Sequence, residues 1–294
     1  DRVAILSENQ PNWGVAYLAI NRCGAVVVPV LPDFPASDVK SILSHAEVAA
    51  CFASAKLRSK AVEAGLDDGA ASVYLLDNLE RLDSLSKSAV ERSIAVKSAA
   101  EVPARAPRPE NRYAGRAEDL AAIIYTSGTT GSSKGVMLTN RNLVFDVKAT
   151  SGIPGIRTAD SMLSILPLAH TYECTIGFLI PVSTGCSVYY LSRPPSATVL
   201  MPALHRVRPH LMLSVPLLIE KLYRQSVLPS LTGKPLTRRI YATTLGRKLL
   251  NRLAGRKLRR VFGGRLYFFG IGGAALAPEV EDFLIEARFP YAVG

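Results

Sequence analysis

Residues 126–135 read TSGTTGSSKG and lie between two apolar stretches, LAAIIYT at residues 120–126 and GVMLT at residues 135–139. This segment holds three glycines, six hydroxyl side chains and Lys134. Glycines let the backbone turn and point its N–H groups at an anion, hydroxyls add hydrogen-bond donors, and a lysine adds a positive charge. The pattern predicts a loop between two strands that binds a chain of phosphates.

Two other interpretations of this segment compete with that one. A plain polar turn seldom needs six hydroxyls beside a lysine. A P-loop has glycine directly before its lysine and Ser or Thr directly after it, whereas Lys134 follows Ser133 and precedes Gly135. The sequence therefore argues against a P-loop and favours a phosphate-binding loop of another kind.

Strand and helix patterns alternate on both sides of the loop. Before it, apolar runs at residues 2–7, 25–30, 48–53 and 72–77 are separated by helical patterns at residues 11–23, 37–46 and 56–65. Asn9 or Gln10 is expected near the start of the first helix, and Ser37 or Asp38 is expected to cap the second. After the loop, apolar runs at residues 161–167, 187–191, 211–214 and 265–270 alternate with helical patterns, the last at Pro278–Arg288. The alternation predicts an α/β fold with mostly parallel sheets covered by helices, in which ligands bind beyond the carboxyl ends of the strands.

The patterns divide the chain into three parts. Residues 1–77 form a first strand and helix unit, and residues 119–294 form a second one that contains the phosphate loop. Between them, residues 78–118 lose the rhythm and turn rich in Ser, Ala, Arg and Pro, which predicts a variable surface helix and loop.

The net charge of +11 is distributed very unevenly. Thirteen basic residues and no acidic residue lie between Lys221 and Arg265, so the rest of the chain has 22 basic and 24 acidic residues. Residues 243–262 predict a basic amphipathic helix with Leu245, Leu249, Leu253 and Val261 towards one side. This surface could face solvent, an anionic membrane, or the phosphates of coenzyme A or nucleic acid. A nucleic-acid binder is disfavoured because the segment has few aromatics.

Cysteine spacing and hydropathy point to a reduced compartment. Cys23, Cys51, Cys174 and Cys186 show no CxxC spacing, which predicts neither a disulfide framework nor a zinc site. The apolar stretch at residues 174–191 is broken by Gly177, Pro181 and Gly185, so it predicts a buried helix and strand. The opening residues DRVAILSENQ do not have the pattern of a secretory signal, so none is expected here. We expect a cytoplasmic protein, with peripheral contact at the inner face of a membrane through Arg238–Arg265 if the membrane interpretation holds.

Three motifs carry a resemblance to a known family. IIYTSGTTGSSKGVMLTNRNL, residues 123–143, closely resembles the phosphate-binding signature of the adenylate-forming (AMP-binding) superfamily, although Ser133 stands where that family usually has proline. LPLAHTYECTIGFL, residues 166–179, resembles its second motif, and FGIGGAAL, residues 269–276, resembles its glycine strand. A lone histidine or GIGGA segment would more often be structural. Their order behind the phosphate motif makes them site candidates, and LPLAHTYE is most similar to the long-chain fatty acyl-CoA synthetase branch.

The resemblance implies ATP-dependent activation of a carboxylic acid, a long-chain fatty acid in that branch, to an acyl-adenylate that is then passed to coenzyme A. Lys134 and His170 are the implied catalytic residues. The implied phosphate-binding residues are Thr126, Ser127, Gly128, Thr129, Thr130, Gly131 and Lys134. The residues implied to line the adenine and acyl pocket are His170, Gly272, Gly273 and Ala274. ATP, Mg²⁺, coenzyme A and a fatty acid are the implied cofactors and small-molecule partners. No nucleic acid is expected, and within residues 1–294 no protein metal ligand is implied.

The same resemblance places residues 1–294 in an incomplete large N-terminal AMP-binding domain, truncated at both ends and without the small C-terminal domain. We therefore expect little activity from this stretch alone. Activation of an aryl or other acid, delivery to a carrier protein, and a non-catalytic nucleotide- or lipid-binding module remain open alternatives.

Overall fold

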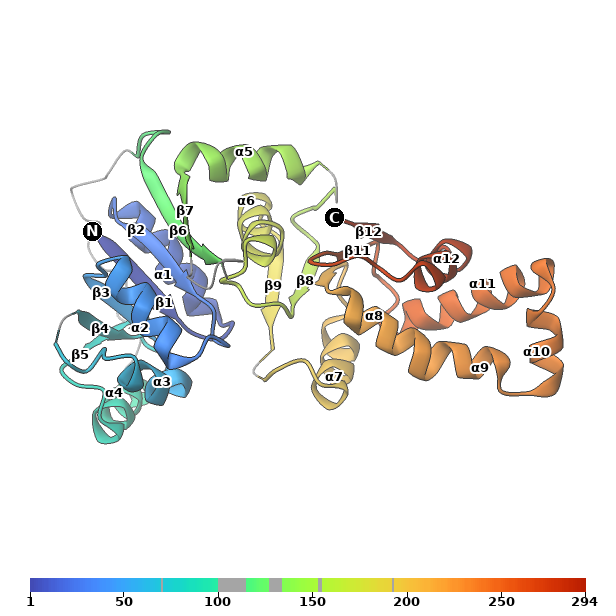
Figure 1. Ribbon diagram of the computed structural model, residues 1–294, viewed down its shortest axis with the longest axis horizontal. Helices are drawn as coiled ribbons and strands as arrows, with labels where there is room; N and C mark the ends of the chain where they lie inside the picture. Colours follow the sequence, from blue (N-terminus) through green and yellow to red (C-terminus); the bar gives the residue numbers. More distant parts are fainter. Residues whose placement is uncertain (70, 100–114, 127–133, 153–154, 192) are drawn as a thin grey trace. The chain divides into compact units, whose positions relative to one another are not determined.

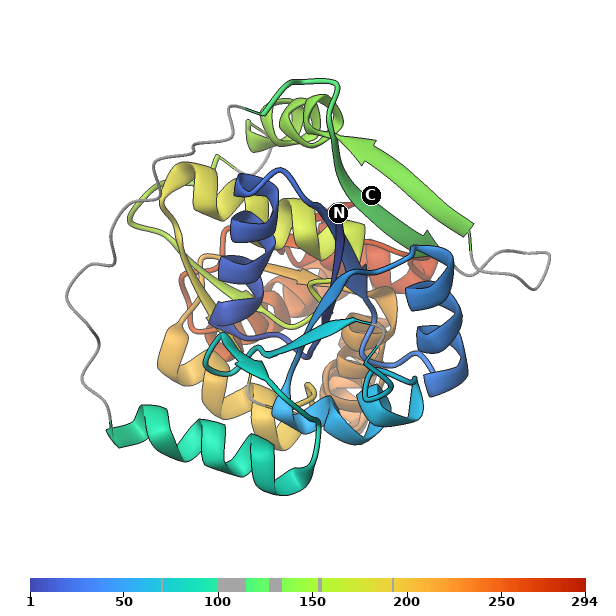
Figure 2. The ribbon, with the colours of Figure 1, turned by 90° about the vertical axis from the view of Figure 1, so that its left-hand side faces the viewer.

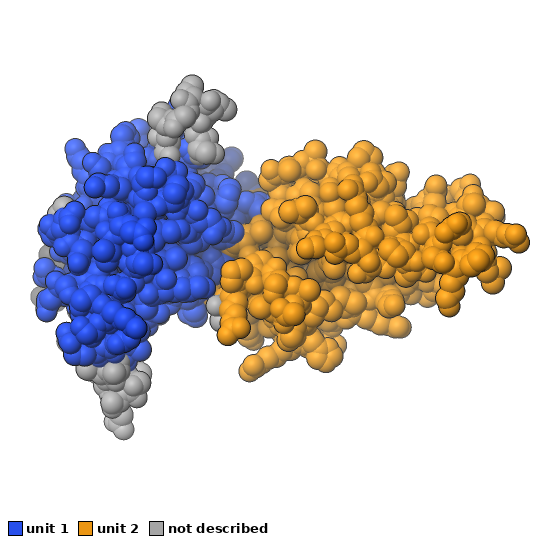
Figure 3. All heavy atoms as spheres, turned by 60° about the horizontal axis from the view of Figure 1, so that its bottom comes forward, with its two compact units in different colours: residues 1–149, 167–175 blue, residues 150–166, 176–294 orange. Residues whose placement is uncertain are grey.

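The computed structural model describes residues 1–69, 71–99, 115–126, 134–152, 155–191 and 193–294. These residues form two compact units (Figure 3). Unit 1 comprises Asp1–Ala149 and Pro167–Thr175, and unit 2 comprises Thr150–Leu166 and Ile176–Gly294. The compact units thus divide the chain near residue 150, whereas the sequence patterns divided it at residues 77 and 119.

Unit 1 is built on a sheet whose described strands have the order β5-β4-β3-β1-β2-β6-β7 (Figure 1). The inner strands are parallel, and only β5 and β7, at the two edges, are antiparallel to their neighbours. The strands are β1 (Arg2–Leu6), β2 (Val26–Val30), β3 (Ala50–Ala53), β4 (Ser72–Leu75), β5 (Glu80–Leu82), β6 (Leu120–Thr126) and β7 (Lys134–Thr139). The predicted mostly parallel sheet is confirmed.

Helices cover both faces of this sheet. They are α1 (Pro11–Arg22), α2 (Ala36–His45), α3 (Arg58–Glu63), α4 (Lys87–Ala99) and α5 (Asn140–Ser151), with a 3₁₀ turn at Ala55–Leu57. Figure 2 shows α1 on one face and α2 and α3 on the other. Trp13 and Tyr17 of α1 are buried, as are Val39 and Ile42 of α2. A parallel sheet covered in this way needs strands that are apolar on both sides, which explains the run VVVPV in β2.

One local prediction in unit 1 was wrong, and another left out a short strand. Neither Ser37 nor Asp38 caps α2, because the helix begins at Ala36 and its N-cap residue, Pro35, has no side chain that can accept a hydrogen bond. Residues 78–118 include the short strand β5 as well as the predicted surface helix α4. The strand gave no sequence signal because Glu80 and Arg81 make up most of its three residues.

Unit 2 contains a parallel sheet whose described strands have the order β12-β11-β10-β8-β9. The strands are β8 (Ser161–Ser164), β9 (Ser187–Tyr190), β10 (Leu211–Ser214), β11 (Phe268–Ile271) and β12 (Tyr291–Val293). The helices are α6 (Ile180–Thr184), α7 (Ala197–Val207), α8 (Pro216–Leu222), α9 (Leu228–Thr232), α10 (Pro235–Tyr241), α11 (Thr244–Val261) and α12 (Pro278–Glu286), with a π-helical turn at Tyr223–Val227. A second π-helical turn, Glu173–Leu179, begins in unit 1 and continues into unit 2.

An aromatic cluster fills the core of unit 2 between β11 and the helices. Phe262 and Phe289 each pack edge-to-face on Phe269, with ring centroids 5.3 and 5.6 Å away. Next to this cluster α11 approaches the end of α12 very closely. A Cβ atom at Gly255 would lie only 2.4 Å from the carbonyl oxygen of Ala287. The glycine therefore allows these two helices to pack in contact.

The basic amphipathic helix predicted at residues 243–262 is α11, and Thr243 caps it by accepting a hydrogen bond from the Gly246 N–H at 3.2 Å. In none of the described ranges is there a helix with the length and apolar character needed to cross a membrane.

Candidate functional site

The two described ends of the predicted phosphate segment lie opposite each other. Thr126 ends β6, Lys134 begins β7, and the two residues are partners in the antiparallel register. Both are exposed. The segment thus leaves the sheet and returns to it at neighbouring positions, as the sequence predicted. The remaining predicted phosphate contacts, Ser127, Gly128, Thr129, Thr130 and Gly131, lie outside the described residues.

The stem of this segment is fixed by a tyrosine that the sequence analysis did not single out. Tyr125 pairs with Gly135 across the two strands, and a Cβ atom at Gly135 would lie 3.3 Å from the tyrosine ring and 3.0 Å from Ile123. The Tyr125 hydroxyl lies 2.7 Å from Nδ1 of His45, at the end of α2. Glycine after Lys134 therefore leaves room for a ring that joins the stem to a helix, and burial raises the pKa of Tyr125.

The stem lies at the carboxyl edge of the first sheet. Because β1, β2 and β6 run parallel, their last residues Leu6, Val30 and Thr126 end at the same edge. β7 runs the other way, so Lys134 begins at that edge too. In open α/β sheets ligands bind beyond this edge. The described ends of the phosphate segment are therefore where a ligand site of this fold belongs.

His170 is attached to the same edge by Asn9. The Asn9 side chain, just after β1, accepts a hydrogen bond from the Leu168 N–H at 2.8 Å. The His170 N–H donates to the Pro167 carbonyl at 2.9 Å, and the His170 carbonyl accepts from the Cys174 N–H at 2.8 Å, leaving the side chain exposed. Asn9 is thus more than a residue near the start of α1. Its position just after a strand was the sequence signal that could have marked Asn9 as part of the site.

Cys174 anchors the other end of this segment against α1. Its thiol is fully enclosed and lies beside the hydroxyl of Tyr17, whose ring stacks on Trp13 at 5.3 Å. Burial raises the pKa of Cys174 to about 12. A thiol that stays protonated at neutral pH is a poor nucleophile, so Cys174 positions the segment by packing. All four cysteines of the chain are free.

In unit 2, Gly272, Gly273 and Ala274 follow the carboxyl end of β11. The Gly272 N–H donates to the Ser214 carbonyl at 3.0 Å, and Gly273 has a φ of +91°, a conformation that favours glycine. Gly273 and Ala274 are exposed. Glu220 holds the end of this turn by accepting from the Ala277 N–H at 3.0 Å. The sequence analysis missed Glu220, because its contact joins residues far apart in the chain.

A polar cluster lies at the opposite, amino-terminal edge of the same sheet. The Tyr267 hydroxyl donates to Asp160 at 2.7 Å, and Nδ1 of His210 accepts from the Ser161 N–H at 3.0 Å. Burial first, and the charge of Arg265 second, lower the pKa of His210. Each of these residues immediately precedes or begins a strand, so the cluster ties the strand starts together.

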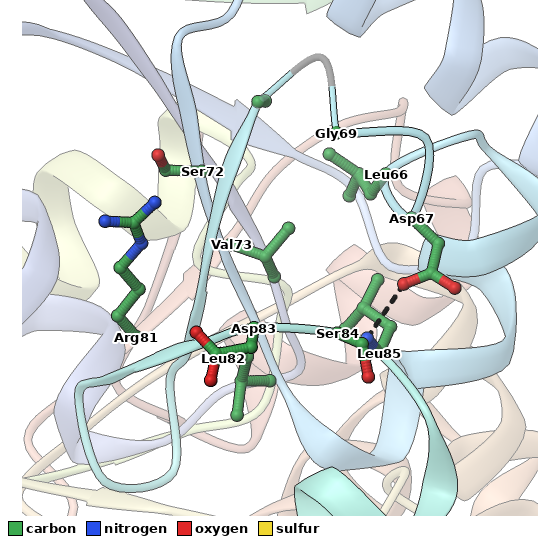
Figure 4. Close-up of a pocket in the computed structure, with 11 residues that line it drawn as sticks. Leu66, Asp67, Gly69, Ser72, Val73, Arg81, Leu82, Asp83, Ser84 and Leu85 are labelled. Carbon is green, nitrogen blue, oxygen red and sulfur yellow. Dashed lines mark hydrogen bonds between the residues drawn. The ribbon is translucent and has the colours of Figure 1, made fainter.

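The cavity drawn in Figure 4 lies at one side edge of the first sheet, and the described ends of the phosphate segment lie towards the other side edge. It has a volume of about 220 Å³ and lies beside β4 and β5, where Asp67 accepts a hydrogen bond from the Leu85 N–H at 2.8 Å. These strands form one edge of the first sheet, and β7 forms the other. No predicted site residue lines this cavity.

No metal centre is formed by the residues that the structure describes, since none of their His, Cys, Asp and Glu side chains gather in groups of three or more that could hold an ion.

Known proteins are similar to this chain in sequence or in fold. The chain is 30% identical over 302 residues to "Long chain acyl-CoA synthetase 6, peroxisomal" of Arabidopsis thaliana, a match covering 96% of the chain and 42% of that protein. It is 29% identical over 307 residues to "Long-chain-fatty-acid--CoA ligase FadD15" of Mycobacterium bovis, covering 96% of the chain and 49% of that protein. The chain therefore spans less than half the length of these relatives.

The structure resembles the A-PCP didomain of carboxylic acid reductase from Segniliparus rugosus in complex with AMP, with a TM-score of 0.73 and 22% identity over 100% of this chain and 41% of that one. This likeness confirms the fold of an adenylate-forming enzyme domain. The family model described as "AMP-binding enzyme" matches residues 1–292, nearly the whole chain. The chain belongs to the AMP-binding enzyme family.

Proposed function

We propose that the protein containing this chain uses ATP to convert a long-chain fatty acid into an acyl-adenylate and then transfers the acyl group to coenzyme A. The observation that carries this proposal is the pairing of Thr126 with Lys134 at the carboxyl edge of a parallel sheet, in a chain of the AMP-binding family. The carboxyl edge is where this type of sheet binds ligands, and the segment between the two residues has the composition of a phosphate-binding loop.

The chemistry explains why such a loop is needed. In the first step a carboxylate oxygen attacks the α-phosphorus of ATP, an O–P bond forms and the bond to pyrophosphate breaks. In the second step the sulfur of coenzyme A attacks the acyl carbon and AMP leaves. Two anions must approach each other in the first step, so positioning and positive charge lower its barrier. We assign this charge to Lys134, which with residues 126–131 holds the β- and γ-phosphates.

The remaining predicted site residues receive roles in the same proposal. His170 borders the acyl group, while Gly272, Gly273 and Ala274 support adenine and the activated carboxylate. The exposure of His170 and the turn after β11 are consistent with these roles, because both follow carboxyl ends of strands. Mg²⁺ enters this proposal with ATP, as the metal complex of the substrate, and no step is assigned to a protein-bound ion.

The fatty-acid substrate is inferred from relatives named as long-chain acyl-CoA synthetases. A cytoplasmic site of action remains part of the proposal, supported by four free cysteines. A ligase for aryl or other acids, a ligase that loads a carrier protein, and a module that binds nucleotide without reaction are the alternatives that an experiment must separate.

The test is acid-dependent pyrophosphate release by the protein expressed from its complete reading frame. Palmitate and benzoate are offered in parallel, with and without coenzyme A. We expect release with palmitate, and a loss of at least tenfold in the Lys134→Ala variant, because a charge-assisted hydrogen bond contributes about 1.5–3 kcal/mol. Lys56→Ala is the matched control, since Lys56 is exposed on the 3₁₀ turn of unit 1.

Release with benzoate but not palmitate would replace the fatty-acid substrate with an aryl acid. Thioester formation on a carrier protein but not on coenzyme A would change the acceptor. ATP binding without any release would support the binding module instead.

A further inference from the structure

The outer side of α11 carries an apolar row that the fold leaves uncovered. Leu245, Leu249 and Leu253 follow one another at four-residue spacing, which places them along one side of a helix. Their exposed fractions are 84%, 58% and 50%. The helix buries a different side, through Asn251, Gly255 and Leu258. The leucine side that an amphipathic pattern would ordinarily turn towards the core is therefore turned outwards.

The neighbouring helix α10 extends this row. Leu236 and Ile240 of α10, again four residues apart, are 71% and 39% exposed. A Cβ atom at Gly246 would lie 2.7 Å from the side chain of Ile240, so Ile240 lies directly beside the start of α11. Single exposed leucines are common on protein surfaces, whereas a continuous exposed row is informative. Figure 1 shows α10 joining α9 to α11 at one end of unit 2.

Positive charge flanks the row along its length. Arg252 and Arg256 lie three residues after Leu249 and Leu253, so they are neighbours of these leucines on the helix surface. Lys248, Lys257, Arg259 and Arg260 are exposed on the same helix. In the described part of α11 only Arg247 forms an ion pair, with Glu286 of α12 at 2.9 Å. Glu286 thus neutralises Arg247 near the start of α11, while the other basic residues of this described helix form no ion pair with protein side chains.

We propose that the α10–α11 face, defined by Leu236, Ile240, Leu245, Leu249, Leu253 and the flanking basic residues of α11, docks on an anionic lipid membrane. A row of leucines flanked by cations matches the two layers of a membrane surface, which are the apolar acyl-chain boundary and the charged phosphate headgroups. Leucines enter the boundary between headgroups and acyl chains, while arginines and lysines contact the phosphates. The absence of acidic residues from Lys221 to Arg265 removes the repulsion that an anionic surface would otherwise meet.

A nucleic acid fits this face less well. Non-specific binding of single strands relies on aromatic side chains that stack on bases. Of the aromatics in the basic segment, Tyr223 and Phe262 are buried and Tyr241 is only partly exposed. The leucine row would gain nothing from a phosphate backbone. Lipid is the occupant that uses both features of the surface.

Flotation with lipid vesicles tests the proposal on the protein expressed from its complete reading frame. Vesicles contain phosphatidylcholine alone or phosphatidylcholine with phosphatidylglycerol. We expect binding to the anionic vesicles only. Arg256→Gln with Arg260→Gln should weaken binding by about 25-fold, since each cation near an anionic surface contributes a factor of about five. Leu249→Gln with Leu253→Gln should weaken it on the order of tenfold or more.

Matched controls come from unit 1. Lys40→Gln with Lys56→Gln removes the same charge from exposed positions elsewhere, and Phe145→Gln removes an apolar side chain that is 69% exposed. Both should leave vesicle binding unchanged. All substituted positions are exposed, and unchanged circular dichroism spectra would verify that the variants fold.

Three outcomes would overturn the proposal. The first is no binding to either vesicle type, and the second is binding that both α11 variants retain. The third is equal loss in the unit 1 controls, which would indicate attraction by total charge alone. Tight binding of single-stranded RNA that the leucine variant keeps, without vesicle binding, would assign the face to nucleic acid. Pyrophosphate release with a water-soluble acid is measured in parallel, so a failed docking test is not confused with a failed ligase test.

Discussion

Gly255 provides a test of the packing in unit 2 in which even the sign of the effect is informative. In a helix, Gly→Ala ordinarily stabilises by about 1 kcal/mol. At this position the new Cβ would lie 2.4 Å from the Ala287 carbonyl oxygen and 2.7 Å from the Ala287 Cβ. Neither atom is the end of a flexible side chain, so α11 and α12 must separate. Overpacking of this kind costs about 1–3 kcal/mol.

We take the upper end of that range, because a contact below 3.0 Å with backbone requires movement of a helix. Gly255→Ala should then destabilise by about 2 kcal/mol net, which corresponds to a fall in the midpoint of thermal unfolding of roughly 5 °C. Circular dichroism during heating and in urea gives both quantities. Gly152→Ala is the control, since nothing lies within 4 Å of its added Cβ. A Gly255→Ala variant as stable as the parent, or more stable, would refute this helix contact.

Three further predictions concern single polar contacts. Tyr125→Phe keeps the ring beside the phosphate stem but removes its hydroxyl bond to the imidazole of α2, so urea unfolding should show a loss of about 1 kcal/mol; an unchanged midpoint would contradict that bond. Asn9→Ala should speed hydrogen exchange of the Leu168 amide, and unchanged protection would mean that another group holds the segment. Because the pKa of His210 is lowered below its ordinary 6.5 by burial and then by Arg265, the unfolded chain takes up a proton more readily than the folded one. Stability should therefore fall as pH drops through 6.5 towards the lowered pKa, and His210→Asn, which keeps an acceptor, should flatten this slope; an equal slope in the variant would rule out His210.

Local patterns were enough to predict most of the strands and helices of this fold. The alternation of apolar runs with helical periods located β1, α1 and β2 within a residue or two at their ends, and the basic run at residues 243–262 located α11. These signals are local because the spacing of apolar residues within a short stretch distinguishes a strand from a helix. The short strand β5 escaped because its pairing with β4, not its composition, makes it a strand.

Contacts between distant residues were beyond the sequence patterns. Nothing local indicates that Asn9 bonds to Leu168, or that Tyr125 lies beside His45. The leucines of α11 show the same limit, because their spacing places them on one side of the helix without saying which side faces the core. Gly255 decides that question by admitting α12 on the opposite side.

The candidate site, too, was predicted in part from the sequence and in part only from the structure. Its residues came from composition and from a family resemblance, and the structure adds that Thr126, Lys134 and His170 belong to the carboxyl edge of one sheet. Gly272, Gly273 and Ala274 occupy the corresponding edge of the second sheet. Binding and rate measurements are the tests of their proposed roles towards ATP and the acid.

Calorimetry with ATP and AMP tests the central claim most directly. Lys134 is assigned to the β- and γ-phosphates, which AMP lacks, so Lys134→Ala should weaken ATP binding by at least about tenfold and leave AMP binding unchanged. Lys56→Ala should change neither affinity. Equal weakening for ATP and AMP, or no weakening for either, would contradict the assignment of this segment to the phosphate chain of ATP.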